Sequence, residues 1–205
     1  VLKTLKSDFI TQGPQVQNFE NKLAKYCKTK YAISSNSATS SLHLACLAIG
    51  LNEKDIVWTS PISFVSSSNC VLFCRAKIDF VDIDPSTYNI SIQSLESKLI
   101  QAKIKNKLPK IVIVVHLTGQ SCDMQSIRKL SLKYGFKIIE DASHAVGAKY
   151  KNNPVGSCKY SDICVFSFHP VKIITTGEGG AALTNNAKLA NKMKLLKSHG
   201  IKKNK

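Results

Sequence analysis

The chain has 205 residues, 43% of them hydrophobic, and a formal net charge of +16. A chain of this length can bury roughly 70% of its unfolded surface without staples, and none of its apolar runs approaches the ~20 residues of a membrane span. Its positive charge is almost all lysine, without the arginines and interleaved aromatic residues of nucleic-acid surfaces, so we expect neither nucleic acid nor a membrane as partner.

Apolar residues first recur at helical spacing in residues 16–27, which predicts an N-terminal helix. A short apolar strand is predicted over 31–35 and a helix over 38–50, which a glycine ends. The alternation of strands and helices continues through the middle of the chain. The next predicted elements are strand 56–60, helix 63–74, strand 77–84, helix 91–105 and strand 110–116.

The second half of the chain keeps this alternation. A helix is predicted over 123–135 with Asp123 as its N-cap. The remaining predicted elements are strands 136–143, 162–168 and 181–185 and a helix over 186–200. This last helix is highly cationic, and we expect it to have little to pack against.

Strands alternating with helices of ten to fifteen residues predict an α/β fold with a mostly parallel central sheet flanked by helices. Ligands of such sheets bind beyond the carboxyl ends of the strands. Polar residues stand at the ends of several predicted strands, namely Ser35, Ser60, His116, Asp141 and Ser167. The sequence therefore predicts a site along this edge.

Seven cysteines are scattered along the chain, and no two form a C-x-x-C pair. This pattern argues against a disulfide framework and a zinc site, so we expect reduced thiols, no metal and a cytoplasmic protein. The run GEGGAA (177–182) fits a dinucleotide-binding pattern, but a strand-like segment follows it instead of a helix, which argues against that use.

Lys172 is the candidate catalytic residue. Its apolar neighbours Val171, Ile173 and Ile174 would disfavour the charged amine and make it a nucleophile. Asp141 closes an apolar strand, where a carboxylate is costly unless paired, and a pyridinium nitrogen would be a suitable partner. A Schiff-base lysine and such an acid are what pyridoxal phosphate chemistry needs. The alternatives are a solvated lysine and a capping aspartate.

Other polar and aromatic residues could complete this site. The turn 36–41 joins a strand to a helix, and its backbone N–H groups and hydroxyls suit a phosphate, or simply cap the helix. Ser167 could add a phosphate contact. His144 could hydrogen-bond the cofactor or orient Asp141, and Phe64 could stack on an aromatic ring; both could instead belong to the core.

With these residues in hand, the chain resembles the DegT/DnrJ/EryC1/StrS family of sugar aminotransferases. The resemblance extends from about Phe9 to Ile201, nearly the whole chain, and its motifs are highly specific when taken together. The matching runs are FITQGPQVQNFE, NSATSSLHLA, TSPISFVSSSNCVLFCRAKIDFVDIDPSTYNI, VVHLTGQSCDM, IIEDASHAVGAKY, SFHPVKIITTGEGGAALTN and LLKSHGI.

The resemblance implies the large domain of a fold-type I enzyme that uses pyridoxal 5′-phosphate (PLP), over residues 1–205. Lys172 matches the Schiff-base lysine. A sister group of sugar dehydratases has histidine at this position, so Lys172 favours an aminotransferase over a dehydratase. The other implied cofactor residues are Asp141 at the ring nitrogen, His144 beside the ring, Phe64 stacked on it, and Ala38, Thr39 and Ser167 on the phosphate side.

The resemblance also implies substrates and partners. Its TSPISFV and HPVKIITTGEGG variants favour the pseudaminic acid pathway, in which the amino group moves from L-glutamate to a UDP-linked 4-keto-6-deoxy-N-acetylhexosamine. The implied substrate contacts are Asp8, Phe9, Ile10, Thr11, Ala38 and Ser167, with Gln120 a weaker candidate. A homodimer with its active site at the subunit interface is implied as well.

Family members have an earlier N-terminal start and a smaller C-terminal domain. We therefore expect this chain alone to bind the cofactor poorly and to show no turnover. Three other functions stay open: another nucleotide-sugar aminotransferase, such as a dTDP-keto-sugar 3-aminotransferase; a regulatory protein that keeps the PLP fold; and a nucleic-acid binder with salt-dependent affinity.

Overall fold

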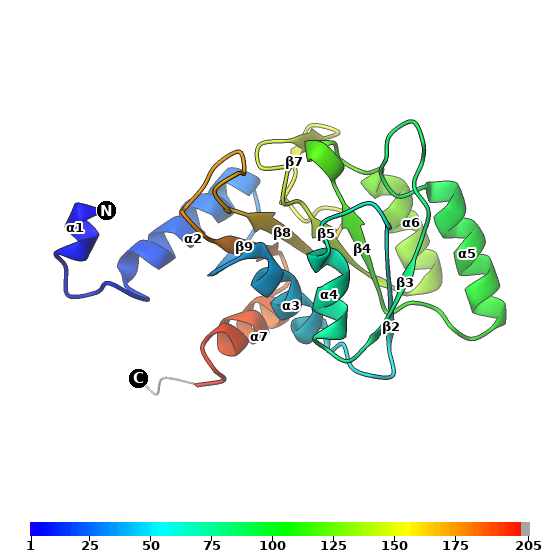
Figure 1. The fold of residues 1–205 in the computed structure, drawn as a ribbon, viewed down its shortest axis with the longest axis horizontal. Coiled ribbons are helices and arrows are strands. Elements are labelled where there is room, and N and C mark those ends of the chain that lie inside the picture. Colours follow the sequence, from blue (N-terminus) through cyan, green and yellow to red (C-terminus); the bar gives the residue numbers. More distant parts are fainter. Residues whose placement is uncertain (202–205) are drawn as a thin grey trace.

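The computed structural model describes residues 1–201 of the chain, so the last four residues of the predicted domain lie outside the described part. Within that part, seven strands form one sheet in the order β1-β9-β8-β5-β4-β2-β3 (Figure 1). The strands are β1 (Tyr31–Ser35), β2 (Ile56–Thr59), β3 (Lys77–Phe80), β4 (Ile111–Val115), β5 (Lys137–Asp141), β8 (Ile163–Ser167) and β9 (Gly180–Thr184). Strand β9 alone runs in the direction opposite to the other strands of this sheet, so the predicted mostly parallel α/β fold is confirmed.

Every helix predicted from the sequence is present, and one more precedes them. They are α1 (Leu2–Leu5), α2 (Pro14–Cys27), α3 (Ala38–Ile49), α4 (Ser66–Leu72), α5 (Ile92–Ile104), α6 (Met124–Tyr134) and α7 (Ala187–Lys197). Asp123 caps α6 as predicted, since its side chain accepts a hydrogen bond from the Ser126 N–H. Three elements were not predicted: α1, a short 3-10 turn (Leu117–Gly119) and a hairpin of β6 (Lys149–Tyr150) and β7 (Asn153–Pro154).

Helices cover both faces of the sheet, which is why its strands read as continuous apolar runs. On β4, Ile111 and Ile113 pack with residues of α3, α4 and α7. Val112 and Val114 point to the other face, where they pack with residues of α5 and α6. Helix α2 packs on that same face, over β8 and β9. Both faces of the sheet are thus buried, and only the ends of its strands reach solvent.

The expectation that the last helix has little to pack against is wrong. Ala190 and Met193 of α7 are fully buried in the core shared with α3. Lys197 Nζ lies 2.7 Å from Glu20 Oε1 of α2, and the same oxygen accepts hydrogen bonds from the Ser34 N–H and hydroxyl at 2.8 and 2.9 Å. This cluster ties α2, β1 and α7 together, with Glu20 only 4% exposed.

Replacing Lys197 with methionine should leave the Glu20 carboxylate buried without a counter-charge. The Ser34 donors remain, so we expect a loss of about 2 kcal/mol, below the usual cost of breaking a buried pair. Urea unfolding measures it. Lys194→Met, an exposed site on the same helix, should change stability by less than about 0.5 kcal/mol. Equal effects of the two variants would contradict the role assigned to this ion pair.

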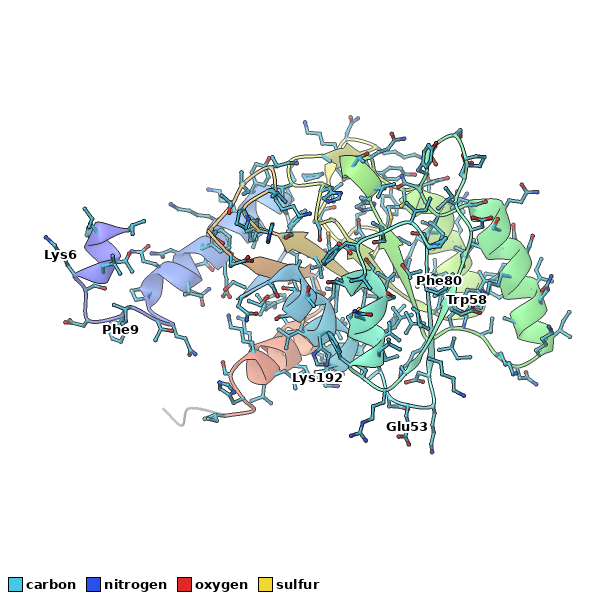
Figure 2. All side chains as sticks on the ribbon, viewed as in Figure 1. Lys6, Phe9, Glu53, Trp58, Phe80 and Lys192 are labelled. Carbon is cyan, nitrogen blue, oxygen red and sulfur yellow. The ribbon has the colours of Figure 1, made fainter. Side chains whose placement is uncertain are left out.

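The N-terminal arm stands apart from the sheet and its helices. Helix α1 is described throughout and buries none of its residues. Figure 2 shows Lys6 and Phe9 of the arm well away from the body of the molecule, and Phe9 and Ile10 are 60% and 72% exposed. The arm therefore contributes little to the stability of the domain as described.

Two further features of the described structure are the state of its cysteines and the length of its helices. Each of the seven cysteines is a buried free thiol in the described structure, and burial raises the pKa of the Cys27 thiol to about 12. Among residues 1–201, no helix combines the length and the apolar character that crossing a bilayer requires.

Candidate active site

A cavity of about 300 Å³ lies beyond the carboxyl ends of β4, β5 and β8, the edge at which the sequence predicts a site. It is lined by every residue predicted to contact the cofactor: Ala38, Thr39, Phe64, Asp141, His144, Ser167 and Lys172. These residues come from five separate segments of the chain. The fold alone therefore brings them together.

Asp141 lies at the deep end of this cavity, where its side chain is almost entirely buried. It shares strand parity with Ile139, so it faces α3 and α4. One carboxylate oxygen, Oδ1, accepts hydrogen bonds from the Ser143 hydroxyl at 2.6 Å and the Ser143 N–H at 3.3 Å. The other, Oδ2, accepts from the Ser67 hydroxyl at 2.6 Å. The buried carboxylate is thereby stabilised and fixed in orientation.

Ser63, Ser67 and Ser143 were not predicted for the site. The hydroxyls of Ser63 and Ser67 are 2.7 Å apart at the start of α4. The sequence signal was the serine-rich run SFVSSS, but a serine run at a helix start more often indicates capping. Only the packing of α4 against the end of β5 distinguishes the two roles.

The N-terminus of α3 borders the cavity next to Ser167. Ala38 and Thr39 occupy its first turn, where backbone N–H groups have no intrahelical acceptor. The N-cap, Ser37, satisfies the Ser40 N–H at 3.1 Å instead. A Cβ atom on Gly180 would collide with the backbone of Ser37 and Ala38, so glycine permits β9 to pack tightly against this turn. The arrangement favours an anion at the helix start.

Lys172 sits in the loop between β8 and β9. Because β9 is antiparallel to β8, with Gly180 paired to Ser167, this loop leaves and re-enters the sheet at the same edge and stays over the cavity. Lys172 itself is half-buried, and its N–H donates to the His169 carbonyl at 3.0 Å.

The apolar setting expected for Lys172 is not supplied by its chain neighbours. Val171 is 78% and Ile173 is 66% exposed, because both side chains point away from the core of the described chain. Phe64 is likewise exposed at the cavity mouth. Phe64 and Val171 line the cavity and leave one rim of it apolar and open.

His144 also lines the cavity, close to Lys172. Burial lowers the pKa of its imidazole and the positive charge of Lys172 lowers it further, against an opposing effect of Asp141. His144 is therefore neutral near pH 7, and it can accept or donate a hydrogen bond without adding charge beside the amine.

His116 forms a second buried polar contact beneath the same edge. Its Nδ1 accepts a hydrogen bond from the Cys122 N–H at 3.2 Å, which places the ring proton on Nε2. Nε2 lies 2.7 Å from Glu140 Oε2, so it donates to that carboxylate. Glu140 also accepts from the Ser161 hydroxyl. This network braces the ends of β4 and β5 on the face opposite Asp141.

The structure does not bring the predicted substrate segment to this cavity. Asp8, Phe9 and Ile10 are exposed on the arm, and Thr11 lines a separate cavity of about 560 Å³ between the arm, α3 and α7. Gln120 lies outside the residues that line the first cavity. The substrate contacts assigned to these residues stay predictions.

The chemistry of the cavity fits PLP. It offers a buried carboxylate for a ring nitrogen, an amine for an aldehyde, a helix N-terminus with a nearby hydroxyl for a phosphate, and an aromatic side chain at its mouth. Among residues 1–201, no group of three or more potential ligand side chains is placed to hold a metal ion.

Comparisons with known proteins agree with this reading. The family model described as "DegT/DnrJ/EryC1/StrS aminotransferase family" matches residues 1–205. The UDP-4-amino-4,6-dideoxy-N-acetyl-beta-L-altrosamine transaminase of Campylobacter jejuni is 46% identical over 202 residues, which are 98% of this chain and 52% of that protein. The GDP-perosamine synthase of Caulobacter vibrioides is 40% identical over 205 residues, 100% of this chain and 53% of that protein.

A solved structure gives the same picture. Helicobacter pylori PseC, an aminotransferase involved in the biosynthesis of pseudoaminic acid, superimposes with a TM-score of 0.88 at 37% identity. The match covers 99% of this chain and 53% of that one. The chain thus spans about half the length of the curated relatives that it matches.

Proposed function

The chain belongs to the DegT/DnrJ/EryC1/StrS aminotransferase family, and on that premise we propose that it forms the cofactor site of a PLP-dependent sugar aminotransferase. The observation that carries the proposal is that Lys172 and the buried Asp141 line one cavity with the start of α3. Bound PLP would supply an electron sink through which an amino group can be exchanged between an amino donor and a keto sugar.

Each side chain of the cavity has a different role in this proposal. Asp141 provides the negative charge that keeps a ring nitrogen protonated, and the N-terminus of α3 with Ser167 holds the phosphate. Phe64 covers a ring face at the mouth. Lys172 anchors the aldehyde through its amine and, once released by the incoming amino group, takes up and returns a proton at Nζ. His144, neutral beside it, can hydrogen-bond without adding positive charge next to Nζ.

We further propose L-glutamate as donor and a UDP-linked 4-keto-6-deoxy-N-acetylhexosamine as acceptor. The support is the similarity to the Campylobacter transaminase and to PseC, whose names refer to altrosamine and pseudoaminic acid. The Caulobacter relative, named for GDP-perosamine, favours a GDP-linked sugar as the second candidate. A cytoplasmic homodimer completes the proposal; the open apolar rim at Phe64 and Val171 supports a site completed by a partner subunit.

A two-stage assay tests the function. The full-length protein loaded with PLP is expected to lose its visible absorption band when L-glutamate is added. The band should return with the UDP-linked keto sugar faster than with dTDP- or GDP-linked keto sugars. If the band returns faster with the dTDP- or GDP-linked keto sugar, that sugar replaces the proposed acceptor. If glutamate does not change the band, the aminotransferase function is refuted.

A further inference from the structure

Ser67 connects α4 to the acid at the bottom of the cavity. It is 1% exposed, and its hydroxyl donates to Asp141 Oδ2 at 2.6 Å across 74 residues of sequence. The donors to the other oxygen both belong to Ser143, two residues further along the same turn. Those bonds move with the turn, so within the described contacts Ser67 is what fixes the carboxylate relative to another element.

The direction of the hydrogen bonds follows from the proton count. An ionised carboxylate only accepts, and a serine hydroxyl has a single proton to give. The Ser67 proton therefore goes to Asp141, and the 2.7 Å contact between Ser63 and Ser67 must be a donation from Ser63 to Ser67. The result is a one-way relay from Ser63 to Ser67 to Asp141.

The relay also reaches the mouth of the cavity. Ser63 lines the cavity and immediately precedes Phe64, the aromatic side chain proposed to cover the cofactor ring. The same relay thus ties the backbone that carries Phe64 to the carboxylate that faces the ring nitrogen. A carboxylate has about four acceptor positions, and three are used here, which leaves one for an incoming N–H donor.

We propose that Ser67 is a positioning residue of the proposed aminotransferase: it holds Asp141 in the orientation that receives the cofactor and, through Ser63, keeps the Phe64 segment in register with it. The inference rests on the proposed function, because these hydrogen bonds position groups that would contact bound PLP. Preorganisation of this kind lowers the entropy lost on binding.

The test compares Ser67→Ala, Ser67→Thr and Ser68→Ala in the full-length protein. Ser68 is the matched control, since it lies on the same helix and its hydroxyl bonds to the Val65 carbonyl instead. We expect Ser67→Ala to weaken PLP binding about tenfold, or about 1.4 kcal/mol, and to reduce the visible circular dichroism of each bound cofactor. Ser67→Thr should restore both, and Ser68→Ala should change neither.

The outcomes separate the inference from its premise. If the unmodified protein does not bind PLP through Lys172, the proposed function fails, and the inference with it. If it does, and Ser67→Ala matches it in affinity and dichroism, the inference alone is overturned. Should Ser67→Ala not fold, Ser63→Ala decides, because it removes the donor and keeps Ser67: weaker dichroism supports the relay, and an unchanged signal overturns it.

Discussion

Replacing Lys172 with alanine is expected to lower amino transfer by about 10³-fold or more, because one amine both anchors the cofactor and moves the proton. Positioned proton transfer alone contributes about 10²- to 10⁴-fold. Lys172 lines the cavity with Asp141 and His144, and its positive charge helps to lower the pKa of the His144 imidazole. Lys172→Arg should be equally inactive, since arginine keeps the charge and cannot act as the nucleophile.

The measurement combines turnover with chemical mapping. Borohydride reduction of the PLP-loaded protein, followed by digestion and mass analysis, should find the pyridoxyl group on the peptide with Lys172. The control is Lys149→Ala, an exposed lysine of the β6–β7 hairpin, which should retain activity and labelling. A label on another lysine would remove Lys172 from its role. Retained biological function in Lys172→Ala would favour a regulatory protein with the PLP fold.

Replacing Asp141 with asparagine should lower activity by about 10²- to 10³-fold, the scale on which a preorganised electrostatic contact acts. Asparagine keeps the volume and can still accept from Ser67 or Ser143, but it lacks the negative charge that holds a ring nitrogen protonated. Asp141 has no salt-bridge partner among the described contacts, so its neutralisation leaves no opposite charge unpaired. We therefore expect the free energy of unfolding to change by less than about 1 kcal/mol.

The matched control for Asp141→Asn is Asp123→Asn. Asp123 also accepts a serine hydroxyl, that of Ser126 at 2.6 Å, but it caps α6 away from the cavity. It should lose little stability and no activity, because asparagine caps a helix about as well as aspartate. Activity and urea unfolding, measured together on both variants, test the assignment. An active Asp141→Asn enzyme would contradict the pairing with the cofactor.

The sequence was a good guide to which segments are buried and a poor guide to their direction. The run IVIVV of β4 could be identified because a strand covered on both faces has no polar positions. The same pattern occurs in parallel and antiparallel strands, so the reversal of β9 could not be predicted from GAALT. The strand predicted over 77–84 ends at Phe80, and the helix predicted over 63–74 covers only Ser66–Leu72.

The site was predictable where chemistry leaves a local mark and not where it depends on packing. An acid closing an apolar strand and a lysine before a glycine-rich bend are visible in the sequence, and the structure places Asp141 and Lys172 at one cavity. Ser67 carries no such mark, since its partner is 74 residues away. The pairing of Lys197 with Glu20 was not predicted for the same reason, and the cationic last helix was expected to have little to pack against.

The ion pair between α2 and α7 has a consequence for synthesis on the ribosome. Glu20 and Lys197 are 177 residues apart, and β1 has β9 as its sheet neighbour. Strand β9 ends about 150 residues after β1, so at about 5–20 residues per second the first strand waits roughly 7 to 30 seconds for its partner to be translated. During that time its edge is unpaired and prone to adhere to other chains. The first strand of this domain is therefore among the last to be paired. In a nascent chain stalled before residue 180, β1 would have no neighbouring strand, because β9 joins it to the rest of the sheet.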